Sequence, residues 1–408
     1  MKNLLARQLE HTPIAVTGLG AFSAAGTTAN DLFERAVEGV PLSSIHERHG
    51  VSMVACAAPW TDRLPPEFRM ARHMDHCARM SLSATREAWL AAGLGETDIA
   101  ADRIGVFVGS SRGPVQLCAA ANDPSGPANP KPSLAANTTF ACISGVVANF
   151  LGARGPAVTV SATCASSAHA IILAAQQILL GTIDVAIAGG CEAPLIPSIY
   201  SQLRSAGVLG SHPDPRKVCR PFSASRNGLV LGEAAAFLIL ESSHVARRRG
   251  VRSLARLSGW GAGSDEVLRA GMSESSGNLH RNMIDALELA GISPDKIGYV
   301  HTHGTGTELN DRMEAQALMQ TFPHGVPCSS TKPITGHCMG ASAALGTVIA
   351  LKSMECGLLP PSVNCQPQDP GFDLDLIHSS SRPSHPSALM VSSSGFWGTN
   401  AQLVFSAV

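Results

Sequence analysis

The chain has 408 residues, and its 30 Lys and Arg residues against 31 Asp and Glu residues leave a net charge of −1 at pH 7. This balance, with no run of like charges, argues against nucleic acid or an anionic membrane surface as the main partner. Only 15% of the residues are charged and 4% are aromatic, while 39 are glycine, a composition that favours closely packed helices and strands over disorder.

The cysteines and the N-terminus bear on the compartment. The eleven cysteines are an odd number and form no C-x-x-C pair, so neither a disulfide framework nor a zinc ribbon is supported. The N-terminal MKNLLARQLEHTP has too short an apolar stretch for a secretory signal, so we expect a cytoplasmic protein with reduced thiols. Residues 155–183 contain no Asp, Glu, Lys or Arg, but their Ser, Thr, His and Gln side chains favour a buried strand and a buried helix over a membrane span.

In the first half, apolar runs alternate with segments of helical spacing. A strand at 157–163 leads directly into a helix at 164–181 and on to a strand at 184–190. This βαβ unit predicts that part of the sheet is parallel. The other elements expected here are a strand and loop at 14–26, helices at 31–40 and 78–93, a strand at 104–111 and a loop at 121–133.

The second half repeats this order of elements, although no sequence identity between the halves is visible. The order suggests a duplicated α/β fold. The expected elements are a helix at 281–290, a strand at 297–303 before the glycine loop GTGT, a helix from about 309, a helix at 340–356, and two strands, ALMVSSS and AQLVFSAV, around GFWGTN.

Cys164 stands at the predicted junction of a strand and a helix. A thiol there meets the positive end of the helix dipole and free backbone N–H groups, which lower its pKa and can hold an oxyanion. The alternative is a buried structural cysteine. The small neighbours Ala162, Ala165 and Ser166 favour the nucleophile, because a substrate must reach the sulfur.

His301 and His303 lie at i and i+2 on a predicted strand and would share one face, so a metal site with Asp311, as in a metal hydrolase, is one alternative. No third ligand has convincing spacing. The glycine loop after His303 does not end in G-K-[ST] and does not match G-x-G-x-x-G, so a phosphate site is not supported either. Its glycines let a backbone approach a ligand closely.

Lys332 and His337 precede a helix of small residues. A cation nearby helps to keep an imidazole neutral and able to donate a hydrogen bond, although a solvated or capping histidine is the simpler interpretation. The segment SSSGFWGTN, by itself, predicts a hairpin loop with an exposed aromatic side chain.

Four segments in this order, ATCAS, HGTGT, STKPITGH and GFWGTN, resemble the motifs of the β-ketoacyl synthases, the decarboxylating condensing enzymes of fatty-acid and polyketide assembly. The pattern is similar to the free-standing, elongating type. The resemblance implies a thiolase-like fold, with duplicated αβαβα halves at 1–250 and 251–408 that form a five-layered core, and a homodimer or a ketosynthase heterodimer. Further matches cover essentially the whole chain: VTGLG, RHMD, IGVFVGSS, RGP, VAIAGGCE, CRPFS and LGEAAAFLILE.

Carried over to this sequence, the resemblance makes Cys164 the nucleophile that accepts an acyl group from an acyl carrier protein. His303 and His337 would bind the carbonyl of the malonyl thioester and promote loss of CO2. The physical logic agrees, because two imidazole donors stabilise the developing enolate better than one. The acyl-enzyme divides one difficult condensation into two easier steps.

The resemblance also implies supporting groups. Lys332 and Glu314 would be charges that orient the histidines. The backbone N–H groups of Cys164 and Phe396 would form the oxyanion hole, and Phe396 would gate the acyl pocket. No metal and no organic cofactor are implied.

Two related kinds of protein are alternatives to an active β-ketoacyl synthase. Thiolases share the fold but use one histidine and a second cysteine, and Cys338 stands beside His337. A chain-length-factor-like partner subunit of a ketosynthase heterodimer would be largely non-catalytic, and Cys164 argues against it because such partners typically lack the nucleophile.

The sequence departs from the family at two positions in the expected substrate pocket. Trp397 replaces a glycine of the usual G-F-G-G-T-N, and its indole should stiffen the loop or fill space. Arg112 stands where elongating relatives usually have an apolar residue. If its guanidinium points inward, a long saturated chain would fit poorly, which suggests a specialised polyketide or polyene-type substrate or a partner subunit at this pocket. Alternatively, Arg112 faces outward or forms an interface ion pair.

Carrier proteins are acidic, so a basic patch is expected at the entrance of the pocket. The positions that the resemblance offers are Arg69, Arg72 and Arg204. Scattered arginines are otherwise an ordinary solvated surface.

Overall fold

The computed structural model describes residues 2–48, 50–59, 71–122, 131–266 and 275–408. A single 11-stranded sheet runs through both halves in the order β13-β11-β10-β15-β16-β9-β1-β8-β6-β4-β5. Its strands are β1 (Ile14–Ser23), β4 (Ile104–Gly109), β5 (Ala157–Val160), β6 (Val185–Glu192), β8 (Ala234–Ser242), β9 (Ala255–Ser264), β10 (Tyr299–His301), β11 (Pro327–Ser329), β13 (Asp375–Leu376), β15 (Ala388–Ser394) and β16 (Thr399–Ser406). Two small sheets are formed by β2 (Ser44–Arg48), β3 (Val51–Cys56) and β7 (Leu231–Gly232), and by β12 (Leu358–Leu359) and β14 (Arg382–Pro383).

The two halves of the sheet have the same pairing pattern. In the first half, β1 pairs antiparallel with β8, β8 antiparallel with β6, and β4 lies parallel between β6 and β5. In the second half, β9, β16, β15, β10 and β11 repeat these directions in the same order. The antiparallel pair β1–β9 joins the halves. The duplicated α/β fold expected from the order of elements is therefore present.

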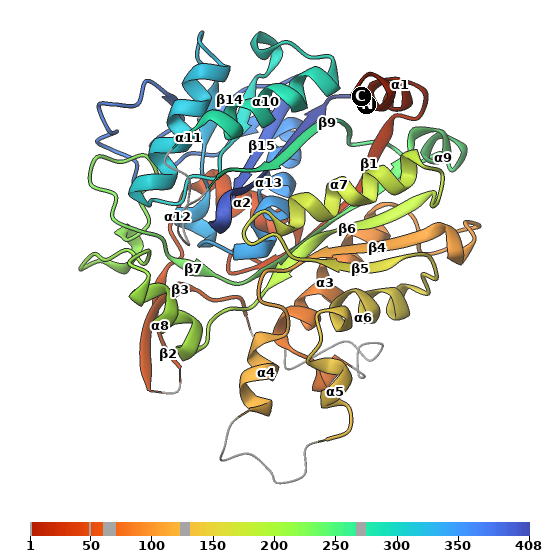
Figure 1. Ribbon diagram of the computed structural model, residues 1–408, viewed down its shortest axis with the longest axis horizontal. Helices are drawn as coiled ribbons and strands as arrows, with labels where there is room; N and C mark the ends of the chain where they lie inside the picture. Colours follow the sequence, from red (N-terminus) through yellow and green to blue (C-terminus); the bar gives the residue numbers. More distant parts are fainter. Residues whose placement is uncertain (1, 49, 60–70, 123–130, 267–274) are drawn as a thin grey trace.

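The helices are α1 (Lys2–His11), α2 (Ala29–Glu38), α3 (His76–Ala91), α4 (Val115–Ala121), α5 (Leu134–Asn137), α6 (Ala141–Leu151), α7 (Ser166–Leu179), α8 (Pro197–Ser205), α9 (Ser243–Arg248), α10 (Gly277–Ala290), α11 (Glu308–Thr321), α12 (Lys332–Thr335) and α13 (Ser342–Cys356). Helices α7 and α13 lie between the inner faces of the two half-sheets and share one apolar core with them (Figure 1). The outer faces are covered by α3 and α6 in one half and by α10 and α11 in the other. The result is the five-layered, thiolase-like arrangement.

Small residues permit this close layering. Helix α13 is buried on nearly all sides, so its Ala, Gly and Ser residues let both sheets approach it. Gly20 on β1 shows how close the outer layer lies, because a Cβ there would stand 2.0 Å from the carbonyl oxygen of Ala84 on α3. Residues 155–183 lack charged side chains because they include α7, the other helix of the buried central layer.

Three boundaries differ from the sequence prediction. Strand β5 ends at Val160 and lies at the edge of the sheet, where Val158 is 39% exposed, so the expected fully buried strand is wrong. Helix α7 begins at Ser166, not at Cys164. Strand β10 ends at His301, two residues before His303. Most of the loop predicted at 121–133 lies outside the described residues.

Among the described residues, none of the helices combines the length and the apolar character needed to span a bilayer. The division at 250/251 falls between α9 and β9 and stays a prediction.

Candidate active site

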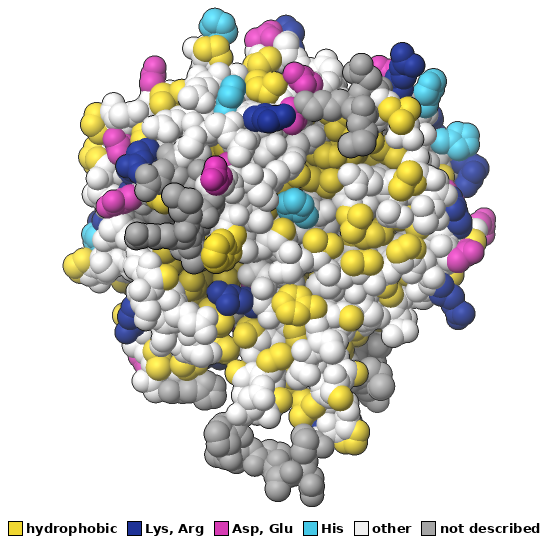
Figure 2. All heavy atoms as spheres, viewed as in Figure 1, with side chains coloured by type: hydrophobic (Ala, Val, Ile, Leu, Met, Phe, Trp, Pro, Cys, Tyr) yellow, Lys and Arg dark blue, Asp and Glu magenta, His cyan; other side chains and the backbone are white. Residues whose placement is uncertain are grey.

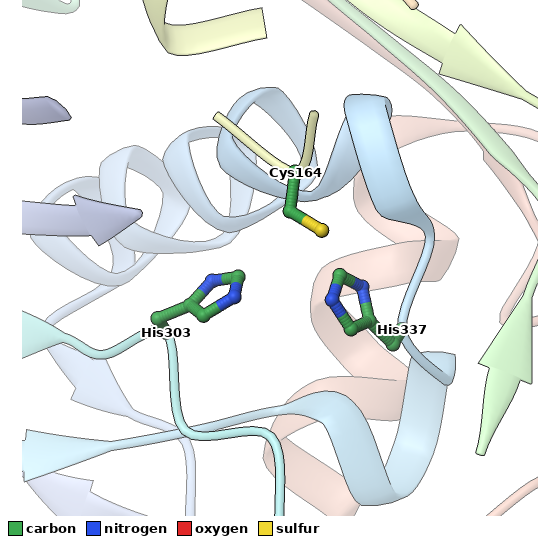
Figure 3. Close-up of side chains that lie close together, drawn as sticks. All are labelled: Cys164, His303 and His337. Atoms are coloured by element: carbon green, nitrogen blue, oxygen red, sulfur yellow. The ribbon is translucent and has the colours of Figure 1, made fainter. Parts of the chain in front are cut away.

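Cys164, His303 and His337 converge on one cavity of about 760 Å³. One ligand-type atom from each side chain, the thiol sulfur and a ring nitrogen of either imidazole, lies within 4.8 Å of the others. Figure 3 shows the thiol pointing between the two rings. Cys164 comes from the turn between β5 and α7, His303 follows β10, and His337 lies between α12 and α13. The cavity therefore joins the nucleophile candidate of the first half to two imidazoles of the second.

A tight turn presents Cys164. Thr163 adopts φ 49°, a left-handed conformation that side chains other than glycine rarely take. Its hydroxyl lies 2.8 Å from that of Thr399 and donates to the carbonyl oxygen of Phe396 at 3.2 Å. Gly395 lets the two segments touch, because a Cβ there would stand 2.0 Å from Thr163 Oγ1. The strained turn is thus held by hydrogen bonds from the opposite half.

Burial controls the thiol of Cys164 and raises its pKa to about 12. Lys332, Arg112 and the Phe396 N–H act in the other direction but do not outweigh burial, and Glu192 adds to it. The expected low pKa is therefore wrong, because Cys164 lies outside the first turn of α7 and its burial disfavours the charged thiolate. At neutral pH the side chain is a thiol.

His337 has a defined tautomer. Its Nδ1 accepts the backbone N–H of Met339 at 3.0 Å and lies 3.1 Å from the hydroxyl of Ser342. A nitrogen that accepts a main-chain N–H carries no proton, so the proton of the neutral ring is on Nε2. Burial and the charge of Lys332 lower the pKa of His337 well below its usual value. His337 is therefore a neutral hydrogen-bond donor at pH 7.

His303 lies at right angles to His337, with ring centroids 5.3 Å apart. Burial lowers its pKa far below the ordinary histidine value, and the charge of Lys332 adds to this. Neither ring nitrogen of His303 forms a hydrogen bond within the described part of the chain, so both face the cavity for a ligand.

Glu314 and Lys332 hold the main chain of His303 rather than its ring. The two carboxylate oxygens of Glu314 accept the N–H groups of His303 and Gly304, each at 2.7 Å. The ammonium of Lys332 donates to the carbonyl oxygen of His303. Burial raises the pKa of Glu314 to about 7, opposed first by these two N–H groups. Glu314 and Lys332 together fix the backbone position from which the His303 side chain extends.

His301 and Asp311 do not join this site. The ring of His301 bonds to the hydroxyl of Thr331 at 3.0 Å and packs on α13 at Gly346. Because the strand ends at His301, the chain turns before His303, and the predicted shared face is wrong. Asp311 accepts the N–H groups of Phe222, Thr305 and Gly306 at 2.8 to 3.2 Å, so its carboxylate is used to hold loops.

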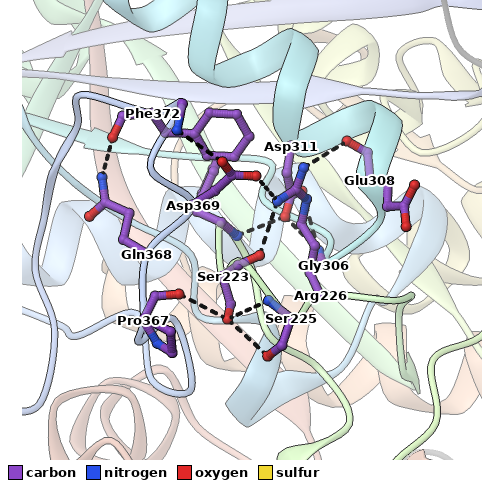
Figure 4. Close-up of polar contacts among 12 residues, drawn as sticks. Ser223, Ser225, Arg226, Gly306, Glu308, Asp311, Pro367, Gln368, Asp369 and Phe372 are labelled. Atoms are coloured by element: carbon purple, nitrogen blue, oxygen red, sulfur yellow. Dashed lines mark hydrogen bonds and ion pairs between the residues drawn. The ribbon is translucent and has the colours of Figure 1, made fainter.

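A second network fixes the same loops from outside (Figure 4). Arg226 pairs with Asp369 at 2.6 Å, donates to the carbonyl oxygens of Ser223 and Glu308, and covers the ring of Phe372 at 4.8 Å. The loops at 222–231 and 304–310 form one wall of the cavity, so these contacts support that wall.

Cys338 is buried beside the site and does not line the cavity. Its thiol contacts the carbonyl oxygens of Thr335 and Gly336 at 3.5 and 3.7 Å. A thiolase-like base would have to face Cys164, and Cys338 faces the backbone of its own turn. Within the described ranges, the group of side chains that could hold a metal ion by type and distance is Cys164, His303 and His337.

The loop at 396–398 borders the cavity. Phe396 is partly buried and packs near Met339, while Trp397 is 59% exposed and adopts φ 62°. Trp397 thus keeps a left-handed conformation that favours glycine. Its indole lies at the rim and does not fill the interior.

Arg112 lines the cavity near Cys164, in the segment that follows β4. Its Nε is buried, whereas the residue as a whole is partly exposed, and its orientation toward the substrate stays a prediction.

The arginines proposed for carrier-protein binding are only partly placed. Arg69 lies outside the described residues. Arg72 is exposed and donates to His73 at 3.0 Å. Arg204 is exposed over the ring of Tyr200 and follows Leu203, a cavity residue. On the face in Figure 2, charged side chains of both signs are interspersed, and the described residues there form no broad basic patch.

Sequence reasoning missed Glu192, Thr305 and Thr307. The carboxylate of Glu192 is buried and accepts the N–H groups of Ser111, Arg112 and Gly340 at 2.7 to 3.0 Å. Thr305 and Thr307 line the cavity with hydroxyls 2.8 Å apart. The signals were an acidic residue at the end of an apolar strand and the hydroxyls within HGTGT.

Comparison with known proteins identifies the family. Residues 11–246 match the β-ketoacyl synthase N-terminal domain and residues 254–366 match the C-terminal domain. A 3-oxoacyl-[acyl-carrier-protein] synthase 2 of Coxiella burnetii is 30% identical over 98% of this chain and all of its own, and one of Staphylococcus aureus is 30% identical over 96% and 97%. The chain belongs to the β-ketoacyl synthase family.

Solved structures agree. A β-ketoacyl synthase from Burkholderia phymatum has a TM-score of 0.88 at 28% identity, covering 97% of this chain and all of its own. A ketosynthase bound to a hexaketide, in complex with its type II polyketide acyl carrier protein, has a TM-score of 0.87 at 26% identity over 97% and 100% of the two chains. The ishigamide ketosynthase/chain length factor has a TM-score of 0.87 at 27% identity over 97% and 99%.

Proposed function

We propose that the protein is a β-ketoacyl-[acyl-carrier-protein] synthase, an acyltransferase that performs decarboxylative Claisen condensation in fatty-acid or polyketide biosynthesis. The observation that carries this proposal is the convergence of one thiol and two neutral imidazoles in a single cavity. Neutral rings are the form that such chemistry needs, because they donate to a developing enolate without carrying charge into a buried site.

In the first step, the sulfur of Cys164 attacks the carbonyl carbon of an acyl thioester. The N–H groups of Cys164 and Phe396 stabilise the oxyanion, and the Phe396 N–H already interacts with the sulfur. The proton of the thiol leaves with the carrier, which departs as a free thiol. His303, whose ring nitrogens face the cavity, accepts this proton from the thiol and passes it to the departing carrier. The thiol, whose pKa is high in the resting enzyme, therefore loses its proton only when substrate is present.

In the second step, malonyl thioester occupies the cavity and loses CO2. His337 donates its Nε2 proton toward the thioester oxygen, and His303 supplies the second donor. The enolate carbon attacks the acyl carbonyl, the C–S bond to Cys164 breaks, and the sulfur takes up one proton. The products are a 3-oxoacyl thioester, CO2 and the free enzyme. Thr305 and Thr307 offer hydroxyls to polar groups of the bound thioester.

The partners follow from this chemistry. Acyl- and malonyl-loaded acyl carrier proteins deliver both substrates, with Arg204 beside the cavity wall and Arg69 and Arg72 as further contact candidates. A homodimer or a ketosynthase heterodimer is supported by the exposed edge strand β5. We place the enzyme in the cytoplasm, since Cys164 must remain a free thiol.

The test is intact mass after mixing with a panel of acyl carrier protein thioesters. Wild type should gain one acyl group, and Cys164→Ala should gain none. Adding malonyl carrier protein should then release a 3-oxoacyl product. No acylation by any donor would overturn the proposal and favour the chain-length-factor-like alternative. The position of Cys164 in the cavity argues against that alternative. Zinc or manganese found in stoichiometric amount in the purified protein would favour a metal enzyme.

A further inference from the structure

Arg112 brings an unpaired cation to the cavity of Cys164. Its Nε is buried without a hydrogen-bond partner, and its guanidinium forms no ion pair or side-chain hydrogen bond with any residue in the described ranges. A guanidinium carries five N–H donors and has no other protonation state at physiological pH. Buried donors of this kind are normally paired, so the open side of Arg112 is a binding position for an acceptor.

Lys332, another cation that acts on Cys164, has partners within the protein. Its ammonium donates to the carbonyl oxygen of His303 and lies near the carboxylate of Glu314. Lys332 therefore supports the backbone of the site, whereas the Arg112 side chain has no such contact with the described residues. Support of the fold therefore accounts for Lys332 and not for the Arg112 guanidinium.

Hydrogen bonds hold the main chain of Arg112. Its N–H donates to Glu192 at 2.9 Å, and the same carboxylate accepts the N–H groups of Ser111 and Gly340. The hydroxyl of Ser110 adds a bond to Glu192 at 3.2 Å and accepts the N–H of Gly113 at 3.0 Å. The carboxylate of Glu192 and the hydroxyl of Ser110 thus hold the backbone at 111–113, so the Arg112 side chain starts from a fixed position.

We propose that Arg112 binds an oxygen acceptor, a keto oxygen or a carboxylate, on the acyl chain carried by Cys164, and so selects oxygen-bearing acyl groups over saturated ones. This inference rests on the function proposed above. The planar fork of a guanidinium matches two oxygens, which a carboxylate or a pair of neighbouring keto groups presents. A saturated chain in the same place would bury the cation without a partner.

The experiment measures the rate of Cys164 acylation by intact mass, using matched carrier-protein thioesters. The four-carbon set is butyryl, 3-oxobutyryl and succinyl, and the six-carbon set is hexanoyl, 5-oxohexanoyl and adipoyl. The variants are Arg112→Met, Arg112→Lys and the control Arg252→Met, whose arginine side chain is 77% exposed. Thermal melting shows that each variant is folded.

We expect wild type and Arg252→Met to react about 10-fold faster with an oxygen-bearing donor than with the saturated donor of the same length. Arg112→Met should lose or reverse this preference, and Arg112→Lys, which keeps charge without the fork, should retain part of it. A keto preference without a carboxylate preference identifies a polyketide-like chain, and the reverse identifies a dicarboxylic acyl group.

Two results would overturn the inference. One is the same ratio of rates in wild type and Arg112→Met or, should that variant melt early, in wild type and Arg112→Lys. The other is an effect of Arg112→Met on malonyl decarboxylation alone, which would assign Arg112 to the extender carboxylate. Absence of acylation with all six donors in wild type is a different failure, because it removes the proposed function itself.

Discussion

The two halves of the molecule place different side chains on one framework. In each half, a buried glutamate accepts two consecutive backbone N–H groups just after a parallel strand. Glu192 holds residues 111–112 after β4 at 2.7 and 2.9 Å, and Glu314 holds residues 303–304 after β10 at 2.7 Å. Burial raises the pKa of either carboxyl to about 7. The same device therefore supports both sides of the site.

The side chains that this device presents are opposite in character. The first half offers a cation, Arg112, and a thiol, Cys164, whereas the second half offers two neutral rings, His303 and His337. The equivalent strands set the positions, and the residues at their ends set the chemistry. We therefore expect variants at Arg112 to affect mainly acylation and variants at His337 to affect mainly decarboxylation, whereas His303 takes part in both steps.

The largest separation should come from His337→Phe. Loss of the Nε2 donor removes charge stabilisation that matters only as the enolate forms, so malonyl decarboxylation should fall by about 100- to 1000-fold. Acylation of Cys164 should continue at a similar rate. CO2 release and intact mass measure the two steps, with exposed His244→Phe as the matched control. Equal losses in both steps would contradict the division of labour.

Matched substitutions of Glu192 and Glu314 test the backbone support in each half. Glu192→Leu and Glu314→Leu each leave at least two buried N–H groups without an acceptor, which should lower the free energy of unfolding by about 2–4 kcal/mol. Denaturant titration measures this loss. Glu192→Leu should slow acylation more than decarboxylation, whereas Glu314→Leu should slow both steps, because it frees the backbone of His303. Identical profiles for the two variants would contradict this difference.

The pKa of Cys164 predicts a pH profile. Because burial raises this pKa to about 12, the thiolate fraction should grow about tenfold per pH unit between pH 7 and 9, and iodoacetamide alkylation of Cys164 should follow without a plateau. Arg112→Met should slow alkylation a few-fold at each pH, since the guanidinium lowers the pKa of Cys164. A plateau near pH 7 would mean that an imidazole already holds the proton.

The smallest effect should be at Trp397. This residue pays for its left-handed backbone with strain, so Trp397→Gly should raise the free energy of unfolding by about 1 kcal/mol. Trp397→Ala is the control, because it removes the indole and keeps the Cβ. Equal stability of the two variants would show that the backbone conformation at 397 costs nothing.

Much of the framework could be predicted from the sequence, because apolar periodicity and small residues follow directly from the central layer. The strands β1, β4 and β6 and the helices α3 and α13 lie within a few residues of their predicted ranges. The exposure of β5 could not be predicted, since an apolar strand looks the same at the edge of a sheet and within it.

The site was harder to derive from residues alone. The motifs pointed to Cys164, His303 and His337, which the cavity brings together. The thiol's pKa was mispredicted because burial is a tertiary property that local helix geometry does not reveal. Glu192 was missed for a similar reason, because its partners lie 80 or more residues away along the chain.

The hydrogen bond from Thr163 to the carbonyl oxygen of Phe396 joins residues 233 positions apart. A ribosome makes Cys164 long before it makes the segment that completes its turn and oxyanion site. The surroundings of Cys164 are therefore incomplete on a nascent chain that ends before residue 396, and they are completed only when the segment at 395–399 docks against Thr163.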